Sequence, residues 1–152
     1  MKKNFEIILQ ARHNFIKLMD ALSLEQINKV PAGYNNNIIW NFAHIIASPQ
    51  ALCYQLAGKP VVLDTVFIEK YKKGTKPEAP VSSEEYAAYK KLAIESIQKL
   101  QQDFENNYFD SYKLYTTSFG VELNSVEEAV KFVALHDGLH LGYAMALRKL
   151  VV

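Results

Sequence analysis

The feature that most constrains the fold is a long stretch, residues 38–57, that contains no Asp, Glu, Lys or Arg. Asparagines precede it as candidate N-caps, and Gly58 followed by Pro60 ends it, as is typical of a helix. A helix that is apolar on all sides must be surrounded by other elements, so we expect this helix to be central to its domain. Pro49 should bend it near residues 45–46, because proline cannot donate a hydrogen bond to the residue four positions back.

Three further segments have the apolar spacing of amphipathic helices, and their expected bounds are residues 3–22, 82–107 and 125–150. Ser23 and Gln26 form a capping-box pair that predicts a short helical turn after the first of them. Residues 60–81 are expected to form an exposed crossover connection. Residues 108–124 should form an irregular link, or a short hairpin, over one end of the helices.

Four long helices with two extended connections predict an all-α fold, an antiparallel four-helix bundle with long crossover connections. The chain has 152 residues, which is the size of one domain, so we expect a single domain over residues 1–152. Only 6 Gly and 5 Pro are present, which leaves little material for the tight turns of a β-sandwich. Helical bundles build metal and cofactor sites from side chains of different helices that face inward.

Charge and cysteine content narrow the expected partners and location. The formal net charge of +1 argues against nucleic acid or an anionic membrane as an obligatory partner. No apolar run reaches the roughly 18–20 residues that span a bilayer, and the first residues show no signal-peptide pattern. The single cysteine, Cys53, fits a reducing compartment and is predicted to be buried and unreactive. We therefore expect a cytoplasmic protein.

Three histidines are candidates for a shared function. His136 and His140 lie four residues apart in the last helix, so they share one face, with Cβ atoms about 5–6 Å apart. They continue an apolar stripe that begins at Val126 and reaches Leu147, at positions where leucine would be the simpler choice. Titratable side chains are seldom buried without a partner. His44 lies in the central helix, so the bundle can bring all three histidines together.

The trio His44, His136 and His140 predicts a divalent metal site. Three neutral imidazoles leave one coordination position open on zinc, as in catalytic rather than closed structural sites, and a water bound there could act as a nucleophile. Nickel, iron and manganese also accept nitrogen ligands. The spacing of His136 and His140 also occurs by chance in many helices. The alternative is a buried network in which the histidines bond to Tyr54, Tyr143 or water.

Two other titratable residues are not predicted to be ligands. His13 falls on the polar side of the first helix and is expected at the surface. Asp137 follows His136, but consecutive helical residues project about 100° apart. It is therefore no obvious counterpart of the general base in His-Glu-x-x-His enzymes.

Over essentially its full length the chain resembles the DinB-like (DinB/YfiT) family of proposed metalloenzymes. The resemblance rests on three segments: residues 41–45, 70–75 and 136–142. It implies a four-helix bundle that holds a divalent ion through one histidine of the second long helix and two of the fourth. Here these are His44, His136 and His140.

Two positions depart from the family pattern. Many members have an acidic residue shortly after the histidine of the second helix, where this chain has Ser48 and Pro49. Members often have glutamine after the last glycine of the motif, where this chain has Tyr143. A fourth protein ligand or a carboxylate base is therefore not carried over from the family.

The resemblance implies a metal-dependent enzyme, either a hydrolase or a thiol-dependent transferase. Its ion, zinc or nickel before iron or manganese, would activate water or a low-molecular-weight thiol for reaction with a small-molecule substrate. Tyr54 and Tyr143 are weak candidates for orienting groups, and no catalytic residue is assigned. The alternative is a non-catalytic, metal-stabilised bundle that binds a small molecule or a protein. A homodimer formed through exposed helix faces is a further expectation.

Overall fold

The computed structural model describes residues 1–152 and is all-α apart from one two-stranded sheet. Its α-helices are α1 (Lys2–Asp20), α2 (Leu24–Asn28), α3 (Ile38–Pro49), α4 (Thr65–Tyr71), α5 (Ser83–Glu105) and α6 (Val126–Val151). A π-helical turn, η1 (Gln50–Tyr54), and a 3-10 turn, η2 (Gln55–Ala57), continue α3. The strands are β1 (Tyr115–Thr116) and β2 (Glu122–Leu123).

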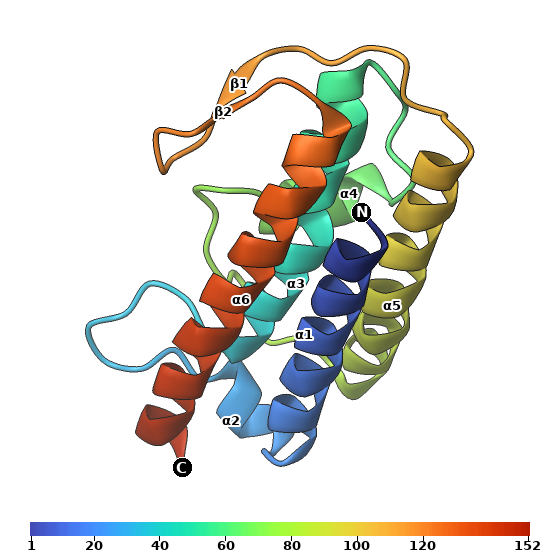
Figure 1. Cartoon of the computed structure of the whole chain (residues 1–152). Coiled ribbons are helices and arrows are strands. Elements are labelled where there is room, and N and C mark those ends of the chain that lie inside the picture. The colour runs from blue at the N-terminus through green and yellow to red at the C-terminus, as the bar shows by residue number, and fades with distance from the viewer.

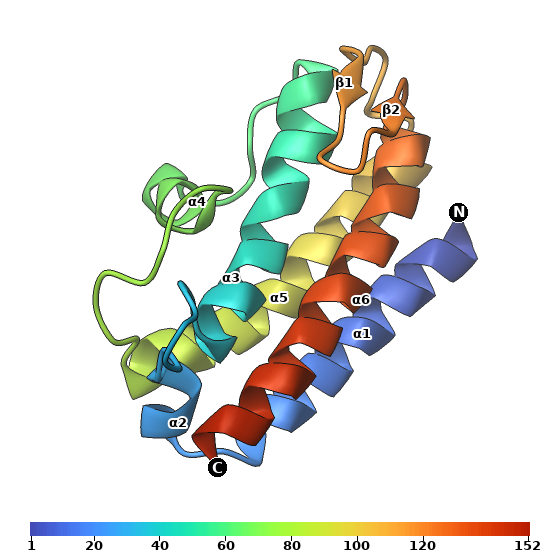
Figure 2. The same cartoon turned by 90° about the vertical axis from the view of Figure 1, so that its left-hand side faces the viewer.

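The four longer helices, α1, α3, α5 and α6, lie side by side (Figures 1 and 2). The chain runs in one direction along α1 and α6 and in the opposite direction along α3 and α5. Helix α6 contacts both α1 and α3 along its length. Side chains of α3 and α6 therefore meet between these two antiparallel helices.

The predicted helix starts are confirmed by their caps. Ser23 and Gln26 form the expected capping box at the start of α2, and Ser82 begins α5 in the same way. The hydroxyl of Ser125 accepts a hydrogen bond from the backbone N–H of Glu128, which fixes the start of α6. These side chains satisfy backbone donors that have no partner within the helix.

Pro49 changes the pitch of the second long helical segment. The α-helix ends there, and the chain continues through η1 and η2 to Gly58, whose φ of 68° is left-handed. The helical path thus reaches Ala57 as predicted, although not as one α-helix. Because Pro49 has no N–H, the carbonyl of Ile45 lacks its usual donor, and Nη2 of Arg12 donates to it instead.

The two long connections differ in structure. Residues 58–82 lead from one end of the helices to the other and contain α4, which begins at the Asp64 cap. Ile68 and Tyr71 of α4 are buried, so the prediction of an exposed connection is wrong for these residues. The second connection contains the predicted short hairpin, in which Tyr115 of β1 pairs with Leu123 of β2 at one end of the molecule (Figure 1).

The apolar core consists of two clusters, one toward each end of the long helices. On α1, buried residues before Arg12 belong to one cluster, and those after it belong to the other. Asp137 divides the buried residues of α6 in the same way. Arg12 and Asp137 are both 0% exposed, so a layer of charge separates the two apolar clusters.

Two simpler predictions concern single features of the chain. Cys53 is fully buried, as predicted, and burial raises the pKa of its thiol to about 12, which disfavours the reactive thiolate. None of the helices combines the length and the apolar character that crossing a bilayer requires.

Candidate metal centre

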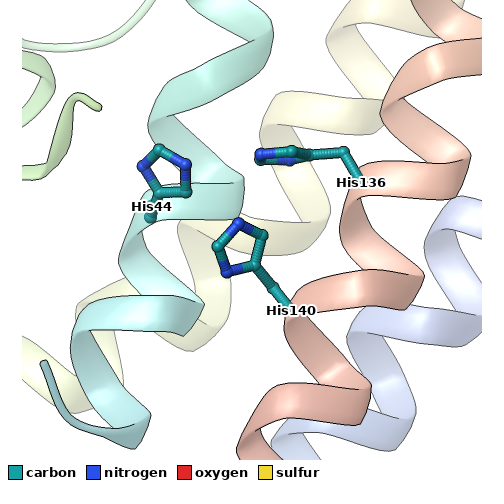
Figure 3. Close-up of side chains that lie close together, drawn as sticks. All are labelled: His44, His136 and His140. Carbon is teal, nitrogen blue, oxygen red and sulfur yellow. The ribbon is translucent and has the colours of Figure 1, made fainter. Parts of the chain in front are cut away.

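His44 of α3 and the pair His136 and His140 of α6 point toward one another between the two helices (Figure 3). The ring centroid of His44 lies 5.1 Å from that of His136 and 4.8 Å from that of His140. The rings of His136 and His140 are 4.5 Å apart. One nitrogen of each ring lies within 4.8 Å of the others, so the three could hold one metal ion. The predicted trio is therefore brought together, and we call it the histidine cluster.

Two rings of the histidine cluster are oriented by hydrogen bonds on their outer side. Nδ1 of His44 lies 2.7 Å from the carbonyl oxygen of Tyr71, which can only accept, so Nδ1 carries the proton. Nδ1 of His140 donates in the same way to Oδ1 of Asn41 at 2.7 Å. Both Nε2 atoms therefore keep their lone pairs, as metal ligation requires.

The orientation of the Asn41 amide is itself fixed by its neighbours. Its Nδ2 donates to the backbone carbonyl of Asn37 at 2.7 Å and to Oδ1 of Asn36 at 3.0 Å. Only the amide oxygen is then free to face His140. Helix α3 thus supplies one candidate ligand, His44, and the residue that orients another.

His136 differs from the other two histidines because its Nδ1 is buried without a hydrogen-bond partner. A buried polar atom without a partner costs roughly 1–3 kcal/mol. Such an atom in a native structure requires an explanation, of which an ion or an ordered water is one. His136 thus brings one nitrogen within 4.8 Å of those of His44 and His140, while no hydrogen bond from the chain holds its ring.

The surroundings keep all three imidazoles neutral. Burial lowers the pKa of His136 to about 3, with further lowering from His140, His44 and Arg12. Burial and the neighbouring His44 lower the pKa of His140 to about 4. The pKa of His44 is also lowered by burial, in spite of its bond to Tyr71. Neutral imidazole is the form that binds a metal, so the cluster is ready to ligate at neutral pH.

Two more side chains border the histidine cluster. The indole of Trp40 stacks on the ring of His44, with centroids 4.9 Å apart and planes within 9°. The hydroxyl of Ser48 donates to the carbonyl of His44 at 2.7 Å and lies 3.3 Å from its Nε2. Ser48 therefore places a hydroxyl beside the nitrogen that faces the other histidines. Sequence reasoning assigned it no role, although it lies one helical turn after His44.

The predicted stripe along α6 is wrong at its centre. Asp137 occupies the fully buried position, whereas His136 and His140 are half-buried at the edge that faces α3. Tyr143, which was placed on the stripe, is 38% exposed. After Val133 the helical spacing allows either the third or the fourth following residue to face the core. Sequence reasoning followed the third residue, His136, and placed Asp137 about 100° away from it.

That partner is Arg12, which sequence reasoning missed. Its Nε donates to Oδ2 of Asp137 at 2.8 Å, and its Nη1 donates to the carbonyl of Ala93 at 2.8 Å and to the hydroxyl of Ser96 at 3.3 Å. With the bond to Ile45 already described, this guanidinium joins α1 to α3, α5 and α6. We call these contacts the Arg12 network. The burial of Arg12 could have been predicted, since Arg12 lies on the same helical face as the apolar residues Ile8 and Phe15.

The other predicted residues have simpler outcomes. His13 is exposed on α1, as predicted. Tyr54 is not an orienting group for the histidine cluster. It packs in the apolar cluster that contains Phe5 and Ile8, and its hydroxyl donates to Asp103 at 2.8 Å. Tyr143 packs against Tyr34, with ring centroids 6.1 Å apart, and makes no hydrogen bond to a histidine.

Comparison with known proteins supports the resemblance seen in the sequence. No curated protein sequence matches the chain. The match to the DinB superfamily covers residues 7–144. This range includes the three residues of the histidine cluster and the buried ion pair of Arg12 and Asp137. The chain therefore belongs to the DinB superfamily.

Proposed function

We propose that this protein is a metal-dependent enzyme whose divalent ion is held by His44, His136 and His140. The observation that carries the proposal is the polarity of the hydrogen bonds in the histidine cluster. Nδ1 of His44 and Nδ1 of His140 donate to Tyr71 and Asn41, so the lone pairs of these two histidines are on Nε2, and one nitrogen of each ring lies within 4.8 Å of the others. A network built only for stability would pair these lone pairs with donors from the chain, but the one hydroxyl in reach, that of Ser48, donates to the carbonyl of His44 instead.

The helical architecture supports the same proposal. The packing of α1, α3, α5 and α6 fits a four-helix bundle, in which metal sites form from inward-facing side chains of different helices. The candidate ligands come from α3 and α6, which are fixed relative to each other by the Arg12 network. Membership of the DinB superfamily agrees with this ligand set.

Three protein nitrogens leave room on the ion for water or for a low-molecular-weight thiol, and zinc or nickel is the favoured metal. When bound, such an ion lowers the pKa of a coordinated water or thiol, so the proposed reaction is hydrolysis or transfer to a thiol. The chain itself contributes orientation. The hydroxyl of Ser48 can hydrogen-bond to a group that sits beside Nε2 of His44, and Trp40 shields the far face of that ring.

Metal content is the first test. Protein purified without chelator, or reconstituted with zinc or nickel, should contain close to one equivalent of metal by mass spectrometry. His140→Ala should lose the ion, whereas His13→Ala, which removes an exposed histidine of α1, should retain it. Less than about 0.2 equivalents in the reconstituted wild type would contradict a site with the sub-micromolar affinity typical of histidine-bound zinc.

Catalysis requires a separate test. The metal-loaded protein should be incubated with a panel of esters and amides, and with a panel of thiols paired with electrophiles. Turnover that is lost in His140→Ala and kept in His13→Ala would support the enzyme. Stoichiometric metal without turnover on either panel would favour the alternative, a metal-stabilised bundle that binds a small molecule or a protein. Turnover that survives His140→Ala would contradict the proposed mechanism.

A further inference from the structure

The outer face of α6 is apolar over more than four helical turns. Between Lys131 and Arg148 no exposed residue of this helix is charged. The face is made of Leu135, Gly138, Leu139, Gly142, Met145 and Ala146, and we call it the α6 outer face. Its larger side chains, Leu135, Leu139 and Met145, are 50–56% exposed. Soluble monomers rarely leave so long an apolar surface uncovered, and such patches mark interaction sites.

The glycines of the α6 outer face have no explanation within this chain. Gly138 and Gly142 are both in regular helix, where glycine is less stable than alanine. A Cβ atom added at either position would meet no atom within 4 Å. Neither residue is therefore needed for packing inside the molecule. A surface that comes from outside the chain and fits into the notch over each glycine would account for both.

The charges at the two ends of α6 indicate that the surface packed over these glycines is the same helix of a second copy. The first turn carries Glu127 and Glu128, and the last turn carries Arg148 and Lys149. Glu127 pairs with Lys131 within the helix, at 2.8 Å, whereas Arg148 and Lys149 form no ion pair in the chain. If two α6 helices pack antiparallel, the basic end of each lies beside the acidic end of the other. The face is therefore complementary to itself.

We propose that the α6 outer face is a homodimer interface, formed with the same face of a second copy about a two-fold axis between Gly138 and Leu139. In this register Leu139 of each copy lies opposite Gly138 of the other, and Leu135 lies opposite Gly142. Glu128 of each copy then lies opposite Lys149 of the other. Each leucine fits the notch over a glycine, as in the isologous interfaces of two-fold dimers. The proposal is independent of the metal and of catalysis.

Sedimentation velocity tests the proposal on the whole chain, with chelator present and again with zinc. At about 100 μM, a concentration that populates even micromolar complexes, the wild type should have twice the 17.3 kDa chain mass. Leu139→Lys places a charge at the centre of the interface and should weaken association at least tenfold. Ile7→Lys is the matched control, because Ile7 on α1 is also 50% exposed, and this variant should remain dimeric. Met145→Lys repeats the test in case Leu139→Lys folds poorly.

Two further variants test the register. Gly142→Ala should raise the melting temperature of the dilute monomer, because alanine favours the helix, and should weaken dimerisation several-fold by filling the notch. Glu128→Lys and Lys149→Glu should each weaken dimerisation, and the double variant should restore it.

Three results would overturn the proposal: a wild type of 17.3 kDa at this concentration, equal association of Leu139→Lys and Ile7→Lys, or failure of the double charge exchange to restore the dimer.

Discussion

The histidine cluster and the Arg12 network lie next to each other, since they use the consecutive residues His136 and Asp137 of α6, yet their hydrogen bonds are arranged differently. Arg12 places each of its three nitrogens on an acceptor, and these acceptors belong to three different helices. In the histidine cluster the bonds to Tyr71 and Asn41 are on the outside. On the inner side only the Ser48 hydroxyl comes within reach, 3.3 Å from Nε2 of His44, and its proton goes to the carbonyl of His44.

This difference shows how α6 uses one residue to hold the helices together and its neighbours as candidate metal ligands. A side chain whose donors are all used by the protein can hold helices together, but it has nothing to offer to a ligand. The histidines retain lone pairs because Tyr71 and Asn41 take up only their outer N–H groups. One position along α6 changes the direction of the side chain by about 100°, so Asp137 is fully buried whereas His136 lies at the half-buried edge that faces α3.

The largest effect is expected when the Arg12 network is broken. Arg12→Met leaves Asp137 buried without its cation and should lower the free energy of unfolding by about 3–5 kcal/mol. Urea denaturation followed by circular dichroism measures this. The double variant Arg12→Met with Asp137→Leu should recover much of the loss, because an apolar pair can replace a buried ion pair. A change below about 1 kcal/mol in the single variant would show that this network is not structural support.

The histidine cluster should contribute stability only when metal is bound. A saturating metal at about 100 times its dissociation constant stabilises the folded state by roughly 2.7 kcal/mol. Thermal unfolding with and without chelator should show this difference in the wild type and none in His136→Ala. Arg12→Met, by contrast, should lose stability under both conditions. If the chelator lowers the melting temperature of His136→Ala as much as that of the wild type, the metal is not at this cluster.

A smaller effect is expected from Asn41, which orients His140 without contacting the ion. Asn41→Ala should weaken metal binding about 10- to 100-fold, as is typical when the hydrogen-bond partner of a ligand is removed. Isothermal titration with zinc measures this. Asn14→Ala is a suitable control, because Asn14 is exposed on α1 and bonds only to Gln10. Equal zinc affinity in the two variants would contradict the orienting role of Asn41.

The smallest effect is expected from pH. The pKa values of the histidine cluster are lowered, to about 3 for His136 and about 4 for His140, so the neutral, ligating form persists well below pH 6. Zinc affinity should therefore change less than about threefold between pH 8 and pH 6, whereas three exposed histidines would lose one to two orders of magnitude. A steep loss of zinc affinity between pH 7 and pH 6 would mean that burial does not protect these ligands.

Much of the helical framework could be predicted because the sequence carries local signals for it. Serine caps mark the starts of α2, α5 and α6, and the uncharged stretch around α3 marks the central segment. The histidine trio could be predicted because its spacing on α6 is local and only one further histidine lies in a buried helix. The short helix α4 could not be predicted in the same way, because Ile68 and Tyr71 are an apolar pair too short to show periodicity.

The Arg12 network was missed for a physical reason. Hydrophobic periodicity identifies a core by its apolar residues, and a buried charge is recognised only through a partner that lies far away in the sequence. Arg12 and Asp137 are 125 residues apart. The orientation of His44 by Tyr71 depends in turn on the position of α4, which no local pattern gives. Sequence reasoning therefore found the candidate ligands but not the groups that hold and orient them.

The proline at position 49 has an effect well beyond its own turn. Because proline has no backbone N–H, the carbonyl oxygen of Ile45 has no partner within the helix, and Arg12 donates to it. An interruption of helical regularity thus becomes an attachment point for the most connected side chain of the core. The segment that carries His44 is anchored at this oxygen, one residue away from the histidine itself.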